Sequence, residues 1–333
     1  MNDKQFKAII VKESDEVKGK FIRSVSLKNI SELPAGSVLI KVKYTALNYK
    51  DALSATGNKG VTRRYPHTPG IDAAGIIEET SDKIFKEGDE VLVTGYDLGM
   101  NTSGGFAEYI RVPAEWVLKL PEGLNLKESM ILGTAGFTAA LSLYKLELNG
   151  LKKENGEVLV TGATGGVGSL AAAILSKNGY DVAASTGKMF EKNYLTTLGA
   201  KRIISREEAT DHSYKPMISS KWAAVIDTVG GNILETAIAS TKMSGSVASC
   251  GRVQSPEFST TVYPFILRGI NLLGINSAET TMDLRLYLWN KLSSDWKPDV
   301  LNDICTEHSL EELNNDIDLI LQGKVRGRIV ARL

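Results

Sequence analysis

The stretch Gly162-Ala-Thr-Gly165-Gly166-Val-Gly168 is the residue pattern whose spacing points most directly to chemistry. It follows an apolar, β-branched segment and opens a segment rich in Ala and Leu. At such a strand-to-helix turn, glycines let the backbone approach a pyrophosphate, and the N–H groups at the start of the helix favour phosphate charge. The pattern predicts a dinucleotide-binding loop, with a structural turn that binds no ligand as the alternative.

The residues after the next apolar segment indicate which dinucleotide would bind. A site selective for NAD places Asp or Glu about 20 residues beyond the loop, where it holds the ribose hydroxyls. Residues 185–188 instead read Ser-Thr-Gly-Lys, and hydroxyls followed by a lysine suit an additional phosphate. Arg202 and Arg206, at the following apolar segment, add positive charge. We expect NADPH rather than NADH, the alternative being that Lys188 is a solvated lysine.

Strand-like and helix-like segments alternate around this loop. The predicted strands lie at 157–162, 181–186, 202–205, 223–228, 245–250 and 271–277, with predicted helices at 166–178 and 188–198. Repeated βα units of this length predict an α/β fold with a parallel sheet covered by helices on both faces. These six predicted strands equal the number in a complete dinucleotide-binding domain.

The first third of the chain follows a different pattern. Short strands separated by Gly- and Pro-containing turns predict a compact, barrel-like domain, with strands at 38–46, 73–78, 90–94 and 106–112. A helix is predicted at 127–146, with Gly133 and Gly136 as weak points. The tail carries helix-like segments at 282–292 and 310–321 and a strand-like segment at 328–333, which we interpret as a return to the first domain. The expected division is 1–127, 128–276 and 277–333.

Composition excludes several classes of function. The chain has 333 residues, 43% of them hydrophobic and 23% charged, and its 39 basic side chains balance 39 acidic ones. Zero net charge gives no reason to expect a nucleic-acid or anionic-membrane partner, and no apolar run approaches the roughly 20 residues of a membrane helix. The first residues lack the apolar stretch of a secretory signal. Two cysteines and three scattered histidines predict neither a disulfide framework nor a zinc site, so we expect a cytoplasmic protein without a metal.

Several motifs resemble one superfamily over essentially the whole chain. The stretches at 48–51 (Asn-Tyr-Lys-Asp), 66–75 (Pro-His-Thr-Pro-Gly-Ile-Asp-Ala-Ala-Gly) and 104–109 (Gly-Gly-Phe-Ala-Glu-Tyr) are similar to the first domain of medium-chain dehydrogenases/reductases. The sequences at 47–53, 131–139 and 264–268 further resemble the acryloyl-CoA reductase branch of the superfamily. This branch is also described as YhdH-type and quinone oxidoreductase-like. The resemblance implies a GroES-like β-barrel catalytic domain, a doubly wound Rossmann domain, a cleft between them, and a homodimer.

The departures from the zinc alcohol dehydrogenases of that superfamily are informative. Where those enzymes have a catalytic cysteine, this chain has the stretch beginning at Asn48, and where they have Gly-His-Glu it has Gly70-Ile71-Asp72. The four-cysteine lobe is also missing, since no cysteine lies around 96–102. Without a metal to polarise a carbonyl or an alcohol, the zinc mechanism has no basis here.

The resemblance therefore implies an NADPH-dependent, zinc-independent reduction of the activated C=C bond of a short enoyl thioester, acryloyl-CoA to propanoyl-CoA. A phenol with an ordinary pKa near about 10 is protonated at neutral pH, so Tyr49 could donate a hydrogen bond to the developing negative charge. Its alternative role is packing under the cofactor. For Asp51 we favour pairing with a nearby base over a proton relay, for Asn48 a role in organising the loop, and for Lys50 a solvated position.

The resemblance also suggests residues that contact the cofactor. They are Tyr49, Thr164, Gly165, Gly166, Val167, Thr186, Gly187, Lys188, Arg202, Arg252, Asn276 and Gln322. Arg252 stands where an apolar residue is expected in the family, so its contact would be through the backbone. The basic tail at 323–328 could meet substrate phosphates, although a solvated charge run is the commoner outcome.

Two other functions stay open. An NADPH:quinone oxidoreductase would share the fold and the cofactor, and nothing in the sequence separates a quinone slot from an acyl-CoA channel. A nucleotide-binding structural or regulatory protein without turnover is the alternative of another class, against which the presence of Asn48, Tyr49 and Asp51 argues mildly. A nucleic-acid-binding role has no recognisable reader motif to support it.

Overall fold

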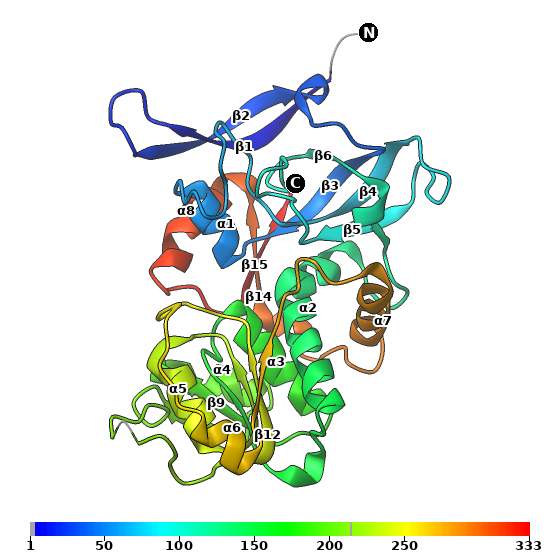
Figure 1. Cartoon of the computed structure of the whole chain (residues 1–333). Helices are drawn as coiled ribbons and strands as arrows, with labels where there is room; N and C mark the ends of the chain where they lie inside the picture. The colour runs from blue at the N-terminus through cyan, green and yellow to red at the C-terminus, as the bar shows by residue number, and fades with distance from the viewer. Residues whose placement is uncertain (1–3, 214) are drawn as a thin grey trace. The chain divides into compact units, whose positions relative to one another are not determined.

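The computed structural model describes residues 4–213 and 215–333, and Figure 1 traces them. The chain forms two compact units. The first contains the described residues up to Thr134 together with Ala278–Ser293 and Cys305–Leu333, and the second contains Ala135–Ser277 and Ser294–Ile304. Among the described residues, no helix has both the length and the apolar character needed to cross a membrane.

The first unit is mostly β-structure. Its strands are β1 (Gln5–Glu13), β2 (Phe21–Asn29), β3 (Val38–Ala46), β4 (Asp72–Thr80), β5 (Glu90–Thr94), β6 (Tyr109–Val112), β7 (Leu118–Lys119), β14 (Cys305–Ser309) and β15 (Arg328–Arg332), and its helices are α1 (Tyr49–Ala55), α7 (Met282–Ser293) and α8 (Leu310–Leu321). Strands β1 and β2 pair antiparallel, while a second sheet has the order β14-β15-β3-β4-β5-β7 with β6 beside β3. The C-terminal strand β15 therefore lies next to β3 of the N-terminal segment, with Val330 opposite Ala46.

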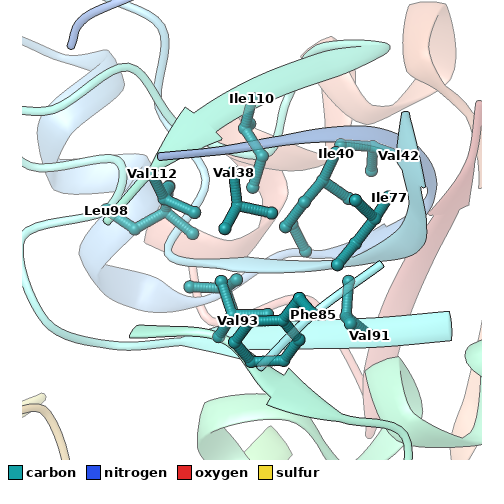
Figure 2. Packing of buried hydrophobic residues seen from close by; sticks show 12 residues of the cluster. Val38, Ile40, Val42, Ile77, Phe85, Val91, Val93, Leu98, Ile110 and Val112 are labelled. Atoms are coloured by element: carbon teal, nitrogen blue, oxygen red, sulfur yellow. The ribbon is translucent and has the colours of Figure 1, made fainter. Parts of the chain in front are cut away.

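Alternation along β3 builds the core of this unit. Val38, Ile40 and Val42 are buried on one face of the strand, as the apolar–polar alternation predicts. Figure 2 shows them packed with side chains from neighbouring strands, including Ile77 of β4 and Val93 of β5. A second cluster forms where α1 and α8 pack together over residues from β1 and β15. This second cluster fixes the position of α1, which begins at Tyr49.

The second unit has the predicted doubly wound architecture. Its strands are β8 (Val158–Val160), β9 (Val182–Thr186), β10 (Arg202–Ser205), β11 (Trp222–Asp227), β12 (Thr241–Ser249) and β13 (Asn271–Gly274), and its helices are α3 (Gly166–Lys177), α4 (Lys192–Thr197), α5 (Gly231–Ser240) and α6 (Tyr263–Arg268). All neighbours in the sheet are parallel, in the order β10-β9-β8-β11-β12-β13. This is the 3-2-1-4-5-6 order of a dinucleotide-binding domain.

Several elements differ from the sequence prediction. Strands β1 and β2 and helix α1 were not predicted, because β2 has no fully buried position and α1 is shorter than the helices that apolar periodicity reveals. Helix α2 (Leu126–Leu148) continues past the expected boundary at residue 127, so the units divide after Thr134 instead. Residues 294–304 belong to the second unit and not to the returning tail.

Candidate active site

A buried network of charged and polar side chains lies at the start of α1 in the first unit. Its centre is Arg328, at the start of β15, whose side chain is 2% exposed. The guanidinium donates from Nη1 to the Leu47 carbonyl and to Asn48 Oδ1, each at 3.0 Å, and from Nη2 to Asp72 Oδ2 at 3.4 Å. Asn48 in turn donates from Nδ2 to the same Asp72 oxygen at 2.8 Å. Arg328 thus ties the C-terminal strand to the residue that precedes Tyr49.

Asp51, which we expected to pair with a base, accepts backbone N–H groups instead. Its Oδ2 accepts from the Asn48 N–H and its Oδ1 from the Ile71 N–H, both at 2.8 Å. The Asn48 bond closes one half of a capping box, which fixes the first turn of α1. Asp51 is fully buried, and its bond from the Asn48 N–H constrains the backbone that leads into Tyr49.

Asp72 joins the kink of α2 to the same network. Its carboxylate accepts from the Thr134 N–H at 3.0 Å and from the Thr134 hydroxyl at 2.6 Å. Gly133, at φ +48°, breaks the helix just before this point. A methyl group at Gly133 would lie 2.5 Å from Asp72 Oδ2 and 2.9 Å from Arg328 Nη2. Only glycine therefore fits both the backbone conformation and the space beside the ion pair.

Tyr49 stands at the edge of this network. It is the first residue of α1 and is half-buried, unlike the fully buried groups that hold it. Within residues 4–213 and 215–333, its hydroxyl has no hydrogen-bond partner. Lys50 beside it is also half-buried, and its Nζ lies 3.9 Å from Met100 Sδ. The geometry presents one phenolic donor on a rigid helix start.

Burial, together with the nearby charge of Asp72, raises the pKa of Asp51 to about 7, although the two backbone N–H donors oppose the shift. The unfolded chain loses this proton near its ordinary pKa of about 4, whereas the folded chain keeps it until about pH 7. Between these values the folded state binds more protons, so the free energy of unfolding falls as the pH rises through the window. We expect Asp51→Asn to lack this part of the pH dependence of stability, as measured by urea unfolding at pH 5, 6 and 7.5. If the free energy of unfolding changed with pH in the same way for the wild type and for Asp51→Asn, this prediction would be contradicted.

The glycine loop of the second unit begins at the carboxyl end of β8. Gly165 precedes the first turn of α3, and Gly165, Gly166 and Val167 are all partly exposed. A methyl group at Gly168 would lie 2.3 Å from the Gly162 carbonyl oxygen, so glycine is required for the helix to pack against the turn. The helix start has no side-chain cap. Its backbone N–H groups are thus available for a phosphate, which the dipole of the helix also favours.

The turn that follows β9, at the same edge of the sheet, lies among basic side chains. Thr186, the last residue of β9, has its hydroxyl 3.1 Å from that of Thr164 and accepts a hydrogen bond from the Lys188 N–H at 2.9 Å. A methyl group at Gly187 would lie 2.7 Å from Arg206 Nη2, so the Arg206 guanidinium lies directly against this turn. Burial lowers the pKa of Lys188, whose shift is partly opposed by Glu191. Lys188 and Arg206 together form a cationic site beside two hydroxyls.

Arg202 lies away from this cationic site, which corrects the sequence assignment. It begins β10 and is opposite Ala183 in the register, whereas Ser205 is opposite Thr186 at the carboxyl end. Its guanidinium pairs with Glu157 and stacks on Trp222, with 4.9 Å between Cζ and the ring centroid. Cofactors bind at the carboxyl ends of parallel strands, which is the end of β10 where Arg206 lies and Arg202 does not.

The other suggested cofactor contacts are divided between the two units. Arg252 follows β12 and Asn276 follows β13, and both are exposed at the carboxyl edge of the parallel sheet. Gln322 caps the C-terminus of α8 in the first unit and is exposed. Asp227, at the end of β11, is fully buried and accepts from the Thr161 hydroxyl at 2.7 Å. Burial raises the pKa of Asp227, whose carboxylate holds the adjoining turn.

Comparison with known proteins matches both units. Residues 34–122 match the family model described as alcohol dehydrogenase GroES-like domain, and residues 166–293 match the model described as zinc-binding dehydrogenase. The chain is 42% identical over 325 residues to acrylyl-CoA reductase AcuI of Ruegeria pomeroyi, covering 98% of each chain. It belongs to the medium-chain dehydrogenase/reductase superfamily. The fold class expected from the sequence and the assignment as an oxidoreductase are thereby confirmed.

Two further relatives place the chain within a branch of this superfamily. It is 48% identical over 313 residues to YhfP of Bacillus subtilis, which carries a quinone oxidoreductase name, covering 93% of this chain and 95% of that protein. The crystal structure of YhfP with NAD bound has a TM-score of 0.95 at 45% identity and covers 99% of this chain and 100% of that one. The YhdH oxidoreductase of Salmonella enterica, in complex with NADP, has a TM-score of 0.94 at 42% identity over 98% of this chain and 99% of that one. The quinone oxidoreductase-like branch is the one the sequence motifs predicted.

The zinc implied by one family model does not fit this member of the superfamily. Within the described part of the chain, no group of three or more His, Cys, Asp or Glu side chains is arranged to hold a metal ion. Cys250 and Cys305 belong to different units. His67 Nε2 lies 2.9 Å from the Gly99 carbonyl oxygen, with which it shares a hydrogen bond.

Sequence reasoning missed three residues of the buried network, namely Asp72, Thr134 and Arg328, and it named Arg206 only as added positive charge while assigning the cofactor contact to Arg202. Asp72 was noted only as a departure from a zinc motif, and Arg328 only as part of a basic tail. Their role follows from β15 lying beside β3, a pairing between residues far apart in the chain. For Arg206, the strand pattern carried a usable signal, because it follows the last residue of β10 and Arg202 is the first.

Proposed function

We propose that this medium-chain reductase uses NADPH to reduce the activated C=C bond of a short enoyl thioester, acryloyl-CoA to propanoyl-CoA, without zinc. The observation that carries the proposal is Tyr49, a phenol without a partner among the described residues, on a helix start held by a buried ion-pair network. The similarity to the acrylyl-CoA reductase AcuI over nearly the full length of both chains supports the same substrate class.

The residues of the second unit fit a dinucleotide with a 2′-phosphate. The open N–H groups at the start of α3 suit the pyrophosphate, and the Thr186 hydroxyl, Lys188 and Arg206 suit the additional phosphate. Residues 185–188, at the carboxyl end of β9, contain no acidic side chain that could hold a free 2′-hydroxyl. NADPH supplies the hydride, and the protein supplies position and hydrogen bonds.

Tyr49 carries the protein's part of the reaction. As the β-carbon of the thioester accepts a hydride, negative charge develops on the thioester oxygen, and the α-carbon then takes a proton from water or a bound donor. A phenol donating to that oxygen stabilises the charge where it forms. Asn48, Asp72 and Arg328 keep the start of α1 fixed, so the donor does not have to be reoriented during the reaction.

A quinone reductase is the second candidate function, because YhfP carries that name at 48% identity. Both activities would use the same fold and the same cofactor site. A quinone needs a flat apolar slot, whereas an acyl-CoA needs contacts to its pantetheine arm and its phosphates.

Turnover of the purified protein separates the two candidates. We expect NADPH oxidation with acryloyl-CoA to exceed oxidation with a simple quinone, and NADPH to be preferred over NADH. Tyr49→Phe should lower kcat for acryloyl-CoA about 100-fold while NADPH affinity changes little, because only the donor to the developing charge is lost. Tyr44→Phe on β3 is the matched control. Turnover of quinone alone, or unchanged kcat in Tyr49→Phe, would refute the enoyl-thioester function or the role of Tyr49, respectively.

We also propose that the protein is a cytoplasmic homodimer. Strand β13 is the last in its sheet, with Leu272 37% exposed, and α6 exposes Ile266 and Leu267. An open edge with apolar neighbours suits a second copy of the same chain. The free thiols of Cys250 and Cys305 suit a reducing compartment. Sedimentation of the wild type and of Leu272→Lys checks the dimer, and a wild-type monomer would contradict it.

A further inference from the structure

Two segments of the first unit concentrate exposed basic side chains. Lys59, Arg63 and Arg64 are exposed in the loop after α1, and Lys324 and Arg326 are exposed between α8 and β15. Neither residues 52–66 nor residues 322–328 contain an acidic side chain. Because the whole chain is electrically neutral, with 39 charges of each sign, this is a local surplus. We call these five residues the basic rim.

A shared apolar cluster brings the two segments to one region. Tyr65 and Val325 both pack against the cluster formed by α1, α8 and β15, and Phe21 joins them with its ring centroid 4.5 Å from that of Tyr65. Lys59 Nζ lies 4.6 Å from the Tyr65 ring centroid. Tyr65 and Val325 turn inward, while Arg64 beside the first and Lys324 and Arg326 on either side of the second are exposed to solvent.

Both segments adjoin the start of α1. The Arg63 N–H donates to Asn101 Oδ1 at 3.2 Å, and the neighbouring Met100 lies beside Lys50, the residue after Tyr49. On the other side, Arg326 comes two positions before Arg328, which donates to Leu47 and Asn48. The basic rim therefore begins next to the candidate catalytic tyrosine and extends outward along the same unit.

The acidic groups that approach this region already accept hydrogen bonds. Asp97 accepts from the Asn101 side chain and the Thr102 hydroxyl, each at 2.9 Å. Asp318 on α8 accepts from Arg23 at 2.6 Å. Both carboxylates therefore have hydrogen-bond partners outside the basic rim, whose five positive charges raise the local potential.

We propose that the basic rim binds the phosphate groups of the coenzyme A part of the substrate. The proposal rests on the enoyl-thioester function proposed above. Coenzyme A carries a pyrophosphate and a 3′-phosphate at the end of a pantetheine arm, far from its thioester. Arg and Lys side chains are the ordinary partners of such groups. With the thioester at Tyr49, the arm leads the phosphates outward to the rim, and a quinone has no group that could use these cations.

The test compares substrates with and without phosphates. We expect the triple variant Arg63→Gln, Lys324→Gln, Arg326→Gln to lower kcat/KM for acryloyl-CoA about tenfold relative to acryloyl-N-acetylcysteamine, because three exposed charge contacts that are individually weak are lost together. Added salt should weaken the wild-type preference for acryloyl-CoA in the same way. The control variant Lys18→Gln, Lys83→Gln, Lys86→Gln removes equal charge from other exposed positions of the unit and should leave the ratio unchanged.

Binding of free coenzyme A separates this proposal from the proposed function. By calorimetry, the wild type should bind coenzyme A more tightly than dephospho-coenzyme A or pantetheine, and the triple variant should lose the difference. The basic rim is overturned as a phosphate site if the triple variant loses kcat/KM equally for both thioesters. It is also overturned if the wild type binds all three ligands with equal affinity, even if acryloyl-CoA is reduced. Absence of turnover with either thioester overturns the enoyl-thioester function. Melting temperature and NADPH affinity check that the variants are folded.

Discussion

Arg328→Met should lower the free energy of unfolding by about 3–5 kcal/mol, as expected when one partner of a buried ion pair is removed. Among the described residues, the guanidinium is the only positive charge hydrogen-bonded to Asp72, and it also donates to the backbone carbonyls of Leu47 and Ile131. Methionine fills much of the volume but leaves the buried Asp72 carboxylate uncompensated. Urea unfolding, followed by circular dichroism at pH 7, measures the effect.

A matched control comes from the same strand. Arg332 at the end of β15 is exposed, and Arg332→Met should change the free energy of unfolding by less than about 0.5 kcal/mol. Adding Asp72→Asn to Arg328→Met removes the uncompensated carboxylate and should recover part of the loss. If the Arg328 and Arg332 variants were equally stable, the buried network would not hold this unit together.

Lys188→Gln combined with Arg206→Gln should lower kcat/KM for NADPH at least about 100-fold while changing the value for NADH only slightly. Each cation would make a charge-assisted hydrogen bond to the 2′-phosphate, and such bonds contribute about 1.5–3 kcal/mol each. NADH has no phosphate at this position, so it loses nothing. Initial rates with both coenzymes and one fixed substrate concentration give the ratio.

Arg202→Gln is the control that distinguishes the two arginines. Its partners are Glu157 and Trp222 at the amino end of the sheet, so the coenzyme preference should not change. A loss of NADPH preference in Arg202→Gln but not in Arg206→Gln would overturn the structural assignment. A wild type that prefers NADH would instead show that the cationic turn does not select the coenzyme. Rates with NADH and NADPH should therefore both be measured, since the related YhfP was crystallised with NAD.

The sequence by itself determined the second unit well. The strand predicted at 202–205 matches β10 to the residue, the helix predicted at 166–178 is one residue longer than α3, and the other predicted strands of this unit differ by only a few residues at their ends. These patterns are local: apolar runs in a parallel sheet, glycines at one turn, and hydroxyls at the next. A dinucleotide-binding domain is built from repeated local βα units, so its sequence signals remain readable.

The network beneath Tyr49 was decided only by the tertiary structure. Asn48 and Asp72 lie on neighbouring parts of the chain, but Arg328 comes from the last strand and Thr134 from the middle of a helix. No spacing rule links these positions, because β15 reaches them by pairing with β3 from the far end of the sequence. The same holds for Arg206, whose contact with Gly187 depends on the register between β9 and β10. Residue types showed which chemistry was available, and long-range strand pairing determined which side chains meet to perform it.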